Sequence, residues 1–251
     1  MQDKTGIKTH ENAEEKAGRG ELETALRNAP IPAGQLISNL GLFLDAKALS
    51  RILMMDFLYK QILETEGVVM ELGTRWGQNT TLFQTFRGIY EPFNRHRKVI
   101  GFDTFEGFPS LRPEDGNSEM MTEGNLSLTP GYLNFLKDLL KVHEGLNPLS
   151  HVEKTFLVKG DATQTLPSFL EDNPQTVIAL AYFDFDIYQP TFDCLKAIAP
   201  RLTKGSVVAF DEVNDPDSPG ETLALMDAVG LRNIRLKRHR HASRVSYYVV
   251  E

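Results

Sequence analysis

The protein has 251 residues, of which 41% are hydrophobic, so the chain is long enough and apolar enough for one α/β domain with an extension. Its net charge of −7, without a long basic block, argues against nucleic acid as the main partner, and the short basic segment Arg235–Arg244 is predicted to be a solvated hairpin. With Cys194 as its one cysteine, it can form neither an intramolecular disulfide nor a cysteine-based zinc cluster.

The start of the chain, MQDKTGIKTHENAEEK, lacks the apolar segment of a secretory signal. No apolar run approaches the length of a membrane span. We therefore expect a cytoplasmic protein without a membrane partner.

The N-terminal part of the sequence predicts helices. The polar stretch ENAEEKAGRGELETALRNA favours a surface helix that breaks near Gly18 and Gly20. The stretch DAKALSRILMMDFLYKQILETEG has strong helix formers with spaced apolar residues, so Asp45 is predicted to cap its start and Gly67 its end. We expect residues 1–66 to form a helical extension that closes over a domain of residues 67–251.

Strand-like and helix-like segments alternate after residue 67. Continuous apolar strands separated by helices predict a parallel sheet covered on both faces. The last two strands form a hairpin, so the final one should run antiparallel. Five such units and a terminal hairpin are typical of the seven-strand methyltransferase sheet. The predicted strands are 68–72, 99–103, 154–161, 176–186, 206–212, 233–239 and 244–251, and the predicted helices are 79–90, 130–146, 163–172, 189–202 and 220–230.

An acidic residue stands at the carboxyl end of each of the five predicted parallel strands. In open α/β sheets, ligands bind beyond these ends. Carboxylates gathered at one edge repel each other unless a positive or hydrogen-bond-donating group lies among them. The edge therefore predicts a cationic ligand, a metal ion or both. The acids are Glu71, Asp103, Asp161, Asp184 with Asp186, and Asp211 with Glu212.

The first loop, ELGTRWGQNT, contains Gly73 and Gly77 but not the three glycines of a dinucleotide fingerprint. S-adenosylmethionine has no pyrophosphate and suits a looser turn, although a plain structural turn is an alternative. Asp103 can accept both ribose hydroxyls of either cofactor. Asp161 can accept from an adenine amino group or cap the next helix.

The last two strand ends offer oxygen ligands without cysteine or clustered histidine. Such ligands suit Mg²⁺ or another hard divalent cation. The alternative is that Asp186 caps the following helix and that Asp211 and Glu212 only begin a loop.

Three motifs, GFDTFEGFP, FDFDIYQPTFDCL and VVAFDEVNDPDSPG, resemble those of the macrocin O-methyltransferase (TylF-like) family, over roughly residues 68–229. The resemblance implies a class I, Rossmann-like α/β methyltransferase fold. It also implies that the protein is an enzyme that uses S-adenosylmethionine and a divalent metal to methylate a sugar hydroxyl in antibiotic biosynthesis, with S-adenosylhomocysteine as product. Two positions depart from the family, because Glu212 replaces an aspartate and Phe185 replaces a glycine.

Residue roles follow from the resemblance. Asp184 and Asp186 are implied as catalytic residues, and Asp184, Asp211 and Glu212 as metal ligands. The implied cofactor-binding residues are Glu71, Gly73, Thr74, Gly77, Asn79, Asp103, Thr104, Asp161 and Ala162.

The expected mechanism is metal-assisted deprotonation of a sugar hydroxyl, followed by in-line methyl transfer. Asp184 is the first candidate for the base, and His143 or His151 the second. We expect a small-molecule glycoside as partner, the loop 104–128 as a wall of its site, and a homo-oligomer. The alternatives are an NAD-dependent oxidoreductase, for which the sequence lacks a Y-x-x-x-K motif, and a non-catalytic binding protein.

Overall fold

The computed structural model describes residues 10–240 and 244–251, and within these ranges seven strands form one sheet. The strands are β1 (Val68–Leu72), β2 (Val99–Asp103), β3 (Thr155–Lys159), β4 (Ile178–Phe183), β5 (Leu202–Phe210), β6 (Lys237–Arg238) and β7 (Ser246–Val249). Their order is β3-β2-β1-β4-β5-β7-β6. β1 to β5 pair in parallel, whereas β7 is antiparallel to both of its neighbours. The predicted antiparallel final strand is confirmed, although part of its predicted turn, residues 241–243, lies outside the described residues.

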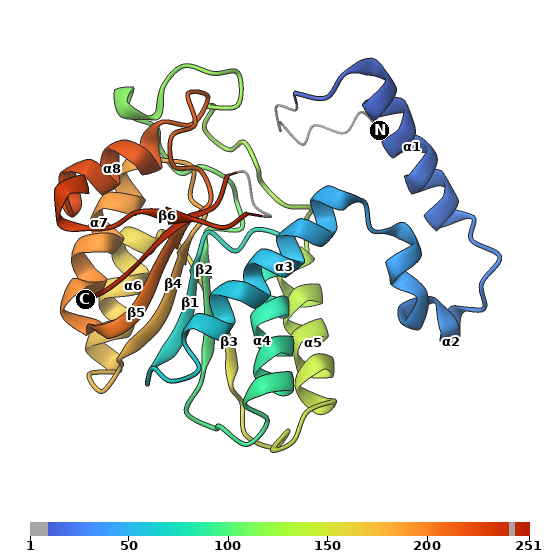
Figure 1. Ribbon diagram of the computed structural model, residues 1–251, viewed down its shortest axis with the longest axis horizontal. Helices are drawn as coiled ribbons and strands as arrows, with labels where there is room; N and C mark the ends of the chain where they lie inside the picture. The colour runs from blue at the N-terminus through green and yellow to red at the C-terminus, as the bar shows by residue number, and fades with distance from the viewer. Residues whose placement is uncertain (1–9, 241–243) are drawn as a thin grey trace.

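Helices cover both faces of the sheet (Figure 1), as the continuous apolar strands predict. The α-helices are α1 (Ala13–Arg27), α2 (Ala33–Leu36), α3 (Ala46–Gln61), α4 (Gln78–Tyr90), α5 (Tyr132–Gly145), α6 (Ala162–Asp172), α7 (Tyr188–Ile198) and α8 (Gly220–Ala228). The 3-10 helices are η1 (Ile37–Phe43), η2 (Pro113–Asp115), η3 (Ala199–Arg201) and η4 (Leu231–Asn233). Helices α3, α4 and α5 lie on one face, and α6, α7 and α8 on the other.

The two faces of β1 supply two hydrophobic cores. Side chains alternate between the faces of a strand, so neighbouring residues of β1 join different cores. Met70 and Leu72 pack in the cluster that contains residues of α6, α7 and α8. Val69 packs in the cluster that contains residues of α3 and α4. Both cores pack against β1 in the interior of the sheet, so its carboxyl end is a rigid support for a site.

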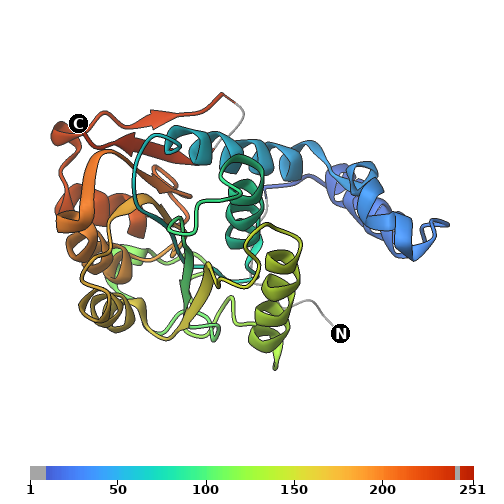
Figure 2. The same ribbon diagram turned by 90° about the horizontal axis from the view of Figure 1, so that it is seen from below.

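The N-terminal helices extend away from the sheet (Figures 1 and 2). Helix α1 runs without interruption through Gly18 and Gly20, so the predicted break is wrong. A capping box stabilises its start, because the Asn12 side chain accepts from the Glu15 backbone N–H and the Glu15 side chain accepts from the Asn12 N–H. An exposed glycine costs a helix only about 1 kcal/mol, so it need not end one.

Helix α3 connects this extension to the domain. As predicted, Asp45 caps its start by accepting from the Ala48 backbone N–H at 2.6 Å. The predicted end at Gly67 is wrong, because the helix already ends at Gln61. Gly67 instead has a positive φ of 134° just before β1, a conformation that L residues rarely adopt. Within the described ranges, no helix is long and apolar enough to cross a membrane.

Candidate active site

A cavity of about 680 Å³ opens at the carboxyl ends of the strands. From β1, the chain adds β2 and β3 on one side of the sheet and then β4 and β5 on the other, so the strand order reverses between β1 and β4. Ligands of open α/β sheets bind at this kind of reversal. The predicted residues that line the cavity are Gly73, Thr74, Asn79, Asp103, Thr104, Asp161, Ala162, Asp184, Asp186, Asp211 and Glu212.

Gly73 brings the first loop against the end of β4. Its φ is 102°, and a Cβ atom there would lie 2.0 Å from the Asp184 carbonyl oxygen. Its backbone N–H donates to the Phe102 carbonyl at 2.9 Å, and the Asp184 N–H donates to the Leu72 carbonyl at 2.8 Å. Only glycine fits this junction, which leaves room for a ligand beside the loop.

Glu71 and Gly77 are absent from the described residues that line the cavity. Glu71 is buried behind the loop, where it accepts from the Thr80 backbone N–H at 2.9 Å and from the Thr80 hydroxyl. Burial raises the pKa of Glu71 to about 7, and the bonds from Thr80 only partly oppose this rise. Glu71, for which a cofactor contact is predicted, therefore holds the start of α4 in place.

Glu71→Gln should flatten the pH dependence of stability. An acid whose pKa is raised by folding favours the folded state when protonated, and this contribution is lost as pH rises from 4.5 towards 7. The wild-type free energy of unfolding should therefore fall over this window, and fall less in the variant. Urea unfolding at several pH values measures it. An equal slope in both proteins would show that Glu71 does not titrate in this window.

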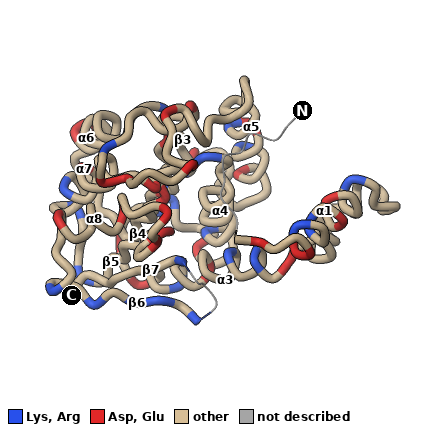
Figure 3. Tube along the Cα trace, turned by 90° about the horizontal axis from the view of Figure 1, so that it is seen from above, with Lys and Arg blue, Asp and Glu red and all other residues tan. Residues whose placement is uncertain are grey.

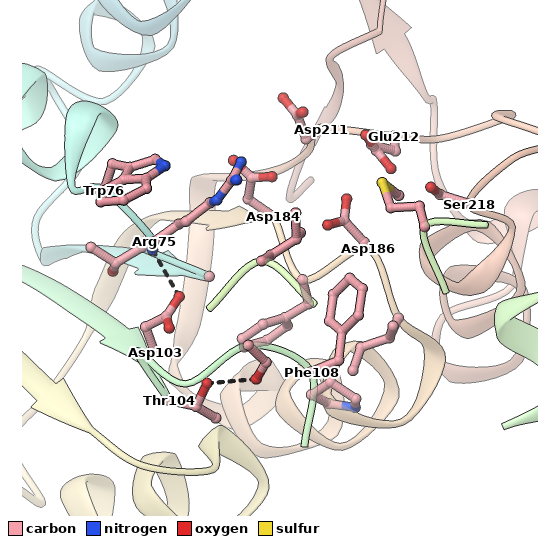
Figure 4. Close-up of a pocket in the computed structure, with 18 of the residues that line it drawn as sticks. Arg75, Trp76, Asp103, Thr104, Phe108, Asp184, Asp186, Asp211, Glu212 and Ser218 are labelled. Carbon is pink, nitrogen blue, oxygen red and sulfur yellow. Dashed lines mark hydrogen bonds between the residues drawn. The ribbon is translucent and has the colours of Figure 1, made fainter. Parts of the chain in front are cut away.

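Asp103 presents its carboxylate to the cavity in a fixed orientation (Figure 4). It accepts from the backbone N–H of Arg75 at 2.7 Å and from that of Phe105 at 2.5 Å. Burial raises the pKa of Asp103, and these two N–H groups oppose the rise. Each carboxylate oxygen has two acceptor sites, so both keep capacity for a ligand hydroxyl.

Asp161 is both a helix cap and a cavity residue. Its side chain accepts from the Thr163 backbone N–H at 2.9 Å at the start of α6, so the predicted cap is confirmed. The same residue lines the cavity beside Ala162. The cap therefore leaves the predicted contact with adenine open rather than replacing it.

Arg51, which has no role in the sequence-based predictions, joins two of the predicted metal ligands. From α3, its Nη2 donates to Asp184 Oδ2 at 2.8 Å and its Nη1 donates to Asp211 Oδ1. The Tyr182 hydroxyl also donates to Asp211 Oδ1, at 2.6 Å. The acidic edge predicts a positive group among its carboxylates, and this guanidinium is such a group.

The pKa values of the two carboxylates are shifted in opposite directions. Burial raises the pKa of Asp184 well above its usual range, and the nearby charge of Asp211 adds to the rise. Burial also opposes ionisation of Asp211, but the charge of Arg51 and the hydrogen bond from Tyr182 outweigh it and lower the pKa. Asp184 is thus the member of the pair that more readily holds a proton.

Asp186 does not cap α7, so the alternative of a helix cap is wrong for this residue. The N-cap position belongs to Ile187, and Asp186 lines the cavity with a positive φ of 63°. Burial and then the charge of Asp211 raise the pKa of Asp186 to about 7. Behind it, the buried Glu221 accepts from the backbone N–H groups of Phe185 and Asp186 at 3.0 and 3.3 Å. Like the role of Arg51, this role of Glu221 is not among the sequence-based predictions.

Glu212 adds a further carboxylate beside this group (Figure 4). Its Oε1 pairs with Arg244, whereas its buried Oε2 has no hydrogen-bond partner among the described residues. Acidic positions gather in the middle of the molecule around β4 (Figure 3). No group of three His, Cys, Asp or Glu side chains in ranges 10–240 and 244–251 is arranged to hold a metal ion. Arginines pair with all three predicted ligands, Asp184, Asp211 and Glu212.

Both segments predicted to cover the site contribute to it. The N-terminal extension supplies His10, Lys47 and Arg51, and the loop 104–128 supplies Phe108 and Met120 among others. The alternative bases His143 and His151 are not among the described residues that line the cavity. Asp184 and Asp186 are therefore better placed than these two histidines to take a proton from a bound substrate.

Comparison with known proteins gives the class of this chain. Residues 54–221 match the model of the macrocin-O-methyltransferase (TylF) family. A crystal structure of CalS11, a calicheamicin methyltransferase, is 42% identical, with a TM-score of 0.94 and coverage of 96% of this chain and 94% of that one. An apo structure of CalS11, described as a TDP-rhamnose 3'-O-methyltransferase, is 40% identical, with a TM-score of 0.85 and coverage of 96% of each chain.

The O-methyltransferase NovP shares the fold at 18% identity, with a TM-score of 0.61 and coverage of 80% of this chain and 79% of that one. A search of the curated proteins found no match. The fold is thus that of the class I methyltransferases, and the chain belongs to the macrocin-O-methyltransferase family. It is an S-adenosylmethionine-dependent methyltransferase, which replaces the alternatives of an oxidoreductase and a non-catalytic binding protein.

Proposed function

We propose that this enzyme transfers a methyl group from S-adenosylmethionine to a sugar hydroxyl in antibiotic biosynthesis. The observation that carries the proposal is the 42% identity to CalS11 over 96% of the chain. The CalS11 relative described as acting on TDP-rhamnose makes a nucleotide-activated deoxysugar the first acceptor to test, and a glycosylated natural product the second. An assay of S-adenosylhomocysteine release with both acceptors tests this choice. Release without dependence on any sugar would contradict it.

The cofactor would bind across the ends of β1, β2 and β3. Gly73 and Thr74 lie where the amino acid part of S-adenosylmethionine needs close approach to the backbone, and Asn79 lies beside them. Asp103 and Thr104 offer acceptors for the ribose, and Asp161 and Ala162 lie where the adenine would end. In this arrangement, Glu71 supports the loop from behind, and Gly77 forms the start of α4 with a positive φ of 79°.

Asp103→Ala should weaken binding of S-adenosylmethionine. It removes acceptors worth about 1.5–3 kcal/mol per hydrogen bond, which corresponds to about a 10- to 150-fold loss of affinity. Calorimetry measures the affinity, and a thermal unfolding scan checks the fold. Glu106→Ala is the matched control, because Glu106 is exposed in the same loop and pairs with Lys159 outside the cavity. Unchanged affinity in folded Asp103→Ala would rule out the ribose role.

A divalent cation such as Mg²⁺ would be held by Asp184, Asp211 and Glu212. These carboxylates follow neighbouring strands, and Oε2 of Glu212 is buried without a partner in the described ranges, so the donor atoms are of the type that suits a hard cation, although their present positions do not form a metal site. When bound, such a cation supplies Lewis acidity that lowers the pKa of the acceptor hydroxyl. Asp184 would accept the hydroxyl proton on one carboxylate oxygen, and Asp186 would keep the pocket negative beside the sulfonium.

The extension of residues 10–66 would act as the lid of the methyltransferase domain, residues 67–251. His10 pairs with Asp217 at 3.1 Å, which links the start of the described chain to the segment between β5 and α8. Both residues line the cavity, so two segments far apart in the sequence meet at the site. A lid placed there would exclude water and align the acceptor with the methyl group.

We further expect a homo-oligomer. Ile37 and Leu42, on the extension, are 79% and 65% exposed, which is costly for a segment without a covering surface. Light scattering after gel filtration should show more than one chain per particle. Ile37→Glu with Leu42→Glu should shift the particle towards a monomer, whereas Ile89→Glu, an exposed residue on α4, should not. A monomeric wild type would refute this expectation.

A further inference from the structure

Arg51 has a contact set that neither cofactor binding nor proton transfer explains. Its guanidinium bridges Asp184 and Asp211, and its Nε donates to Asn79 Oδ1 at 3.4 Å. It also lies 5.9 Å from the centre of the Tyr182 ring. A long side chain from the N-terminal extension thus reaches the ends of β4 and β5 and is fixed there on several sides.

Two buried carboxylates that lie this close together repel each other unless a positive charge or a proton lies between them. Asp184 and Asp211 both touch the same guanidinium, so the position that neutralises them together is filled by Arg51. A divalent cation held by the same two oxygens would need that position. Arg51 and the cation therefore compete for one site, because two positive groups held at the same pair of oxygens would repel each other.

We propose that Arg51 is the resident counter-cation of the metal site and that a divalent cation binds by displacing it. The inference rests on the proposed function, because it takes Asp184 and Asp211 as metal ligands. Glu212 points to the same exchange, because its Oε2 is buried beside these carboxylates and has no hydrogen-bond partner in the part of the chain that the structure describes. Displacement gives the cation three carboxylates, whereas Arg51 engages two.

The exchange couples metal binding to the extension. Arg51 lies on α3, one turn after Lys47, and both line the cavity. With Arg51 seated, α3 is tied to the ends of β4 and β5 by charge-assisted hydrogen bonds. Displacing it removes these bonds and leaves the apolar contacts of α3 in place. The metal-free state thus keeps the carboxylates neutralised and the site ordered until a cation arrives.

The test compares Mn²⁺ binding, without substrate or S-adenosylmethionine, in wild type and Arg51→Gln. Free Mn²⁺ is measured by electron paramagnetic resonance during titration, and Mg²⁺ competition follows. Arg51→Gln should bind Mn²⁺ at least about tenfold more tightly than wild type, a difference of about 1.4 kcal/mol. Mn²⁺ should also raise the Tm of the variant more than that of wild type, since it restores a lost counter-cation.

Two further variants keep the outcome interpretable. Lys47→Gln, which removes a positive charge from the same helix and cavity, should leave Mn²⁺ affinity within about twofold of wild type. Arg51→Lys, which keeps the charge but loses the two-pronged geometry, should fall between wild type and Arg51→Gln and serves if the latter does not fold. Affinity that is equal or weaker in both Arg51 variants, with wild type still binding, would overturn the displacement. Absence of Mn²⁺ binding in every protein would overturn the proposed metal site itself.

Discussion

Asp184→Asn is expected to lower kcat by about a thousandfold while the protein stays folded. General-base catalysis typically contributes about 10²–10⁴-fold, and the amide cannot take the hydroxyl proton. The amide oxygen can still accept from Arg51 Nη2, so the packing around β4 should survive. Steady-state kinetics measures kcat, and calorimetry measures the affinity for S-adenosylmethionine, which should change little.

Glu212→Gln is the matched comparison for Asp184→Asn. It neutralises a neighbouring carboxylate of the same group without removing the proposed base, so its loss of kcat should be clearly smaller. A pH profile separates the two roles further, because activity that depends on an ionised Asp184 should rise with pH as this acid loses its proton. Its raised pKa moves that rise above the range of an ordinary aspartate. Nearly normal kcat in Asp184→Asn would assign the proton transfer to another group.

Gly73→Ala is expected to abolish cofactor binding and to destabilise the fold by about 3 kcal/mol. The new Cβ would lie 2.0 Å from the backbone carbonyl oxygen of Asp184, and φ is 102°. Backbone atoms cannot move aside as a flexible side chain can, so β1 and β4 would separate at the site. Chemical denaturation measures the loss of stability, and calorimetry measures the binding of S-adenosylmethionine.

Gly18→Ala is the control for this substitution. Gly18 lies inside α1, and a Cβ atom added there would meet nothing within 4 Å, so alanine should be neutral or stabilising by up to about 1 kcal/mol. Gly73→Ala with wild-type stability and cofactor affinity would mean that the loop tolerates a side chain. The close junction of β1 and β4 would then have no part in shaping the site.

The sheet was largely predictable because its physical signals are local. Apolar runs such as 68–72 mark strands buried on both faces, and the residue that follows this run, Gly73, lines the cavity. The order of these runs, with helices between them, fixes parallel pairing. The terminal hairpin then predicts an antiparallel final strand, and the structure pairs this strand with β5.

Other features depend on contacts between distant parts of the chain. Arg51 meets Asp184 and Asp211 across more than a hundred residues, and no spacing rule links them. Glu221 resembles an ordinary acid near the start of a helix, yet it is fully buried and accepts backbone N–H groups from the loop after β4. The behaviour of Gly67 likewise depends on its packing against β4 rather than on helix termination.

The most direct test of the proposed function uses S-adenosylmethionine with a trideuterated methyl group. The enzyme is incubated with this donor and TDP-rhamnose, and separately with a glycosylated natural product, and mass spectrometry with NMR then locates the label. The account predicts that the intact trideuteromethyl group appears on a sugar hydroxyl oxygen and that equimolar S-adenosylhomocysteine forms. Label on a carbon, nitrogen or non-sugar oxygen, or no transfer to any sugar by enzyme that binds the donor, would contradict it.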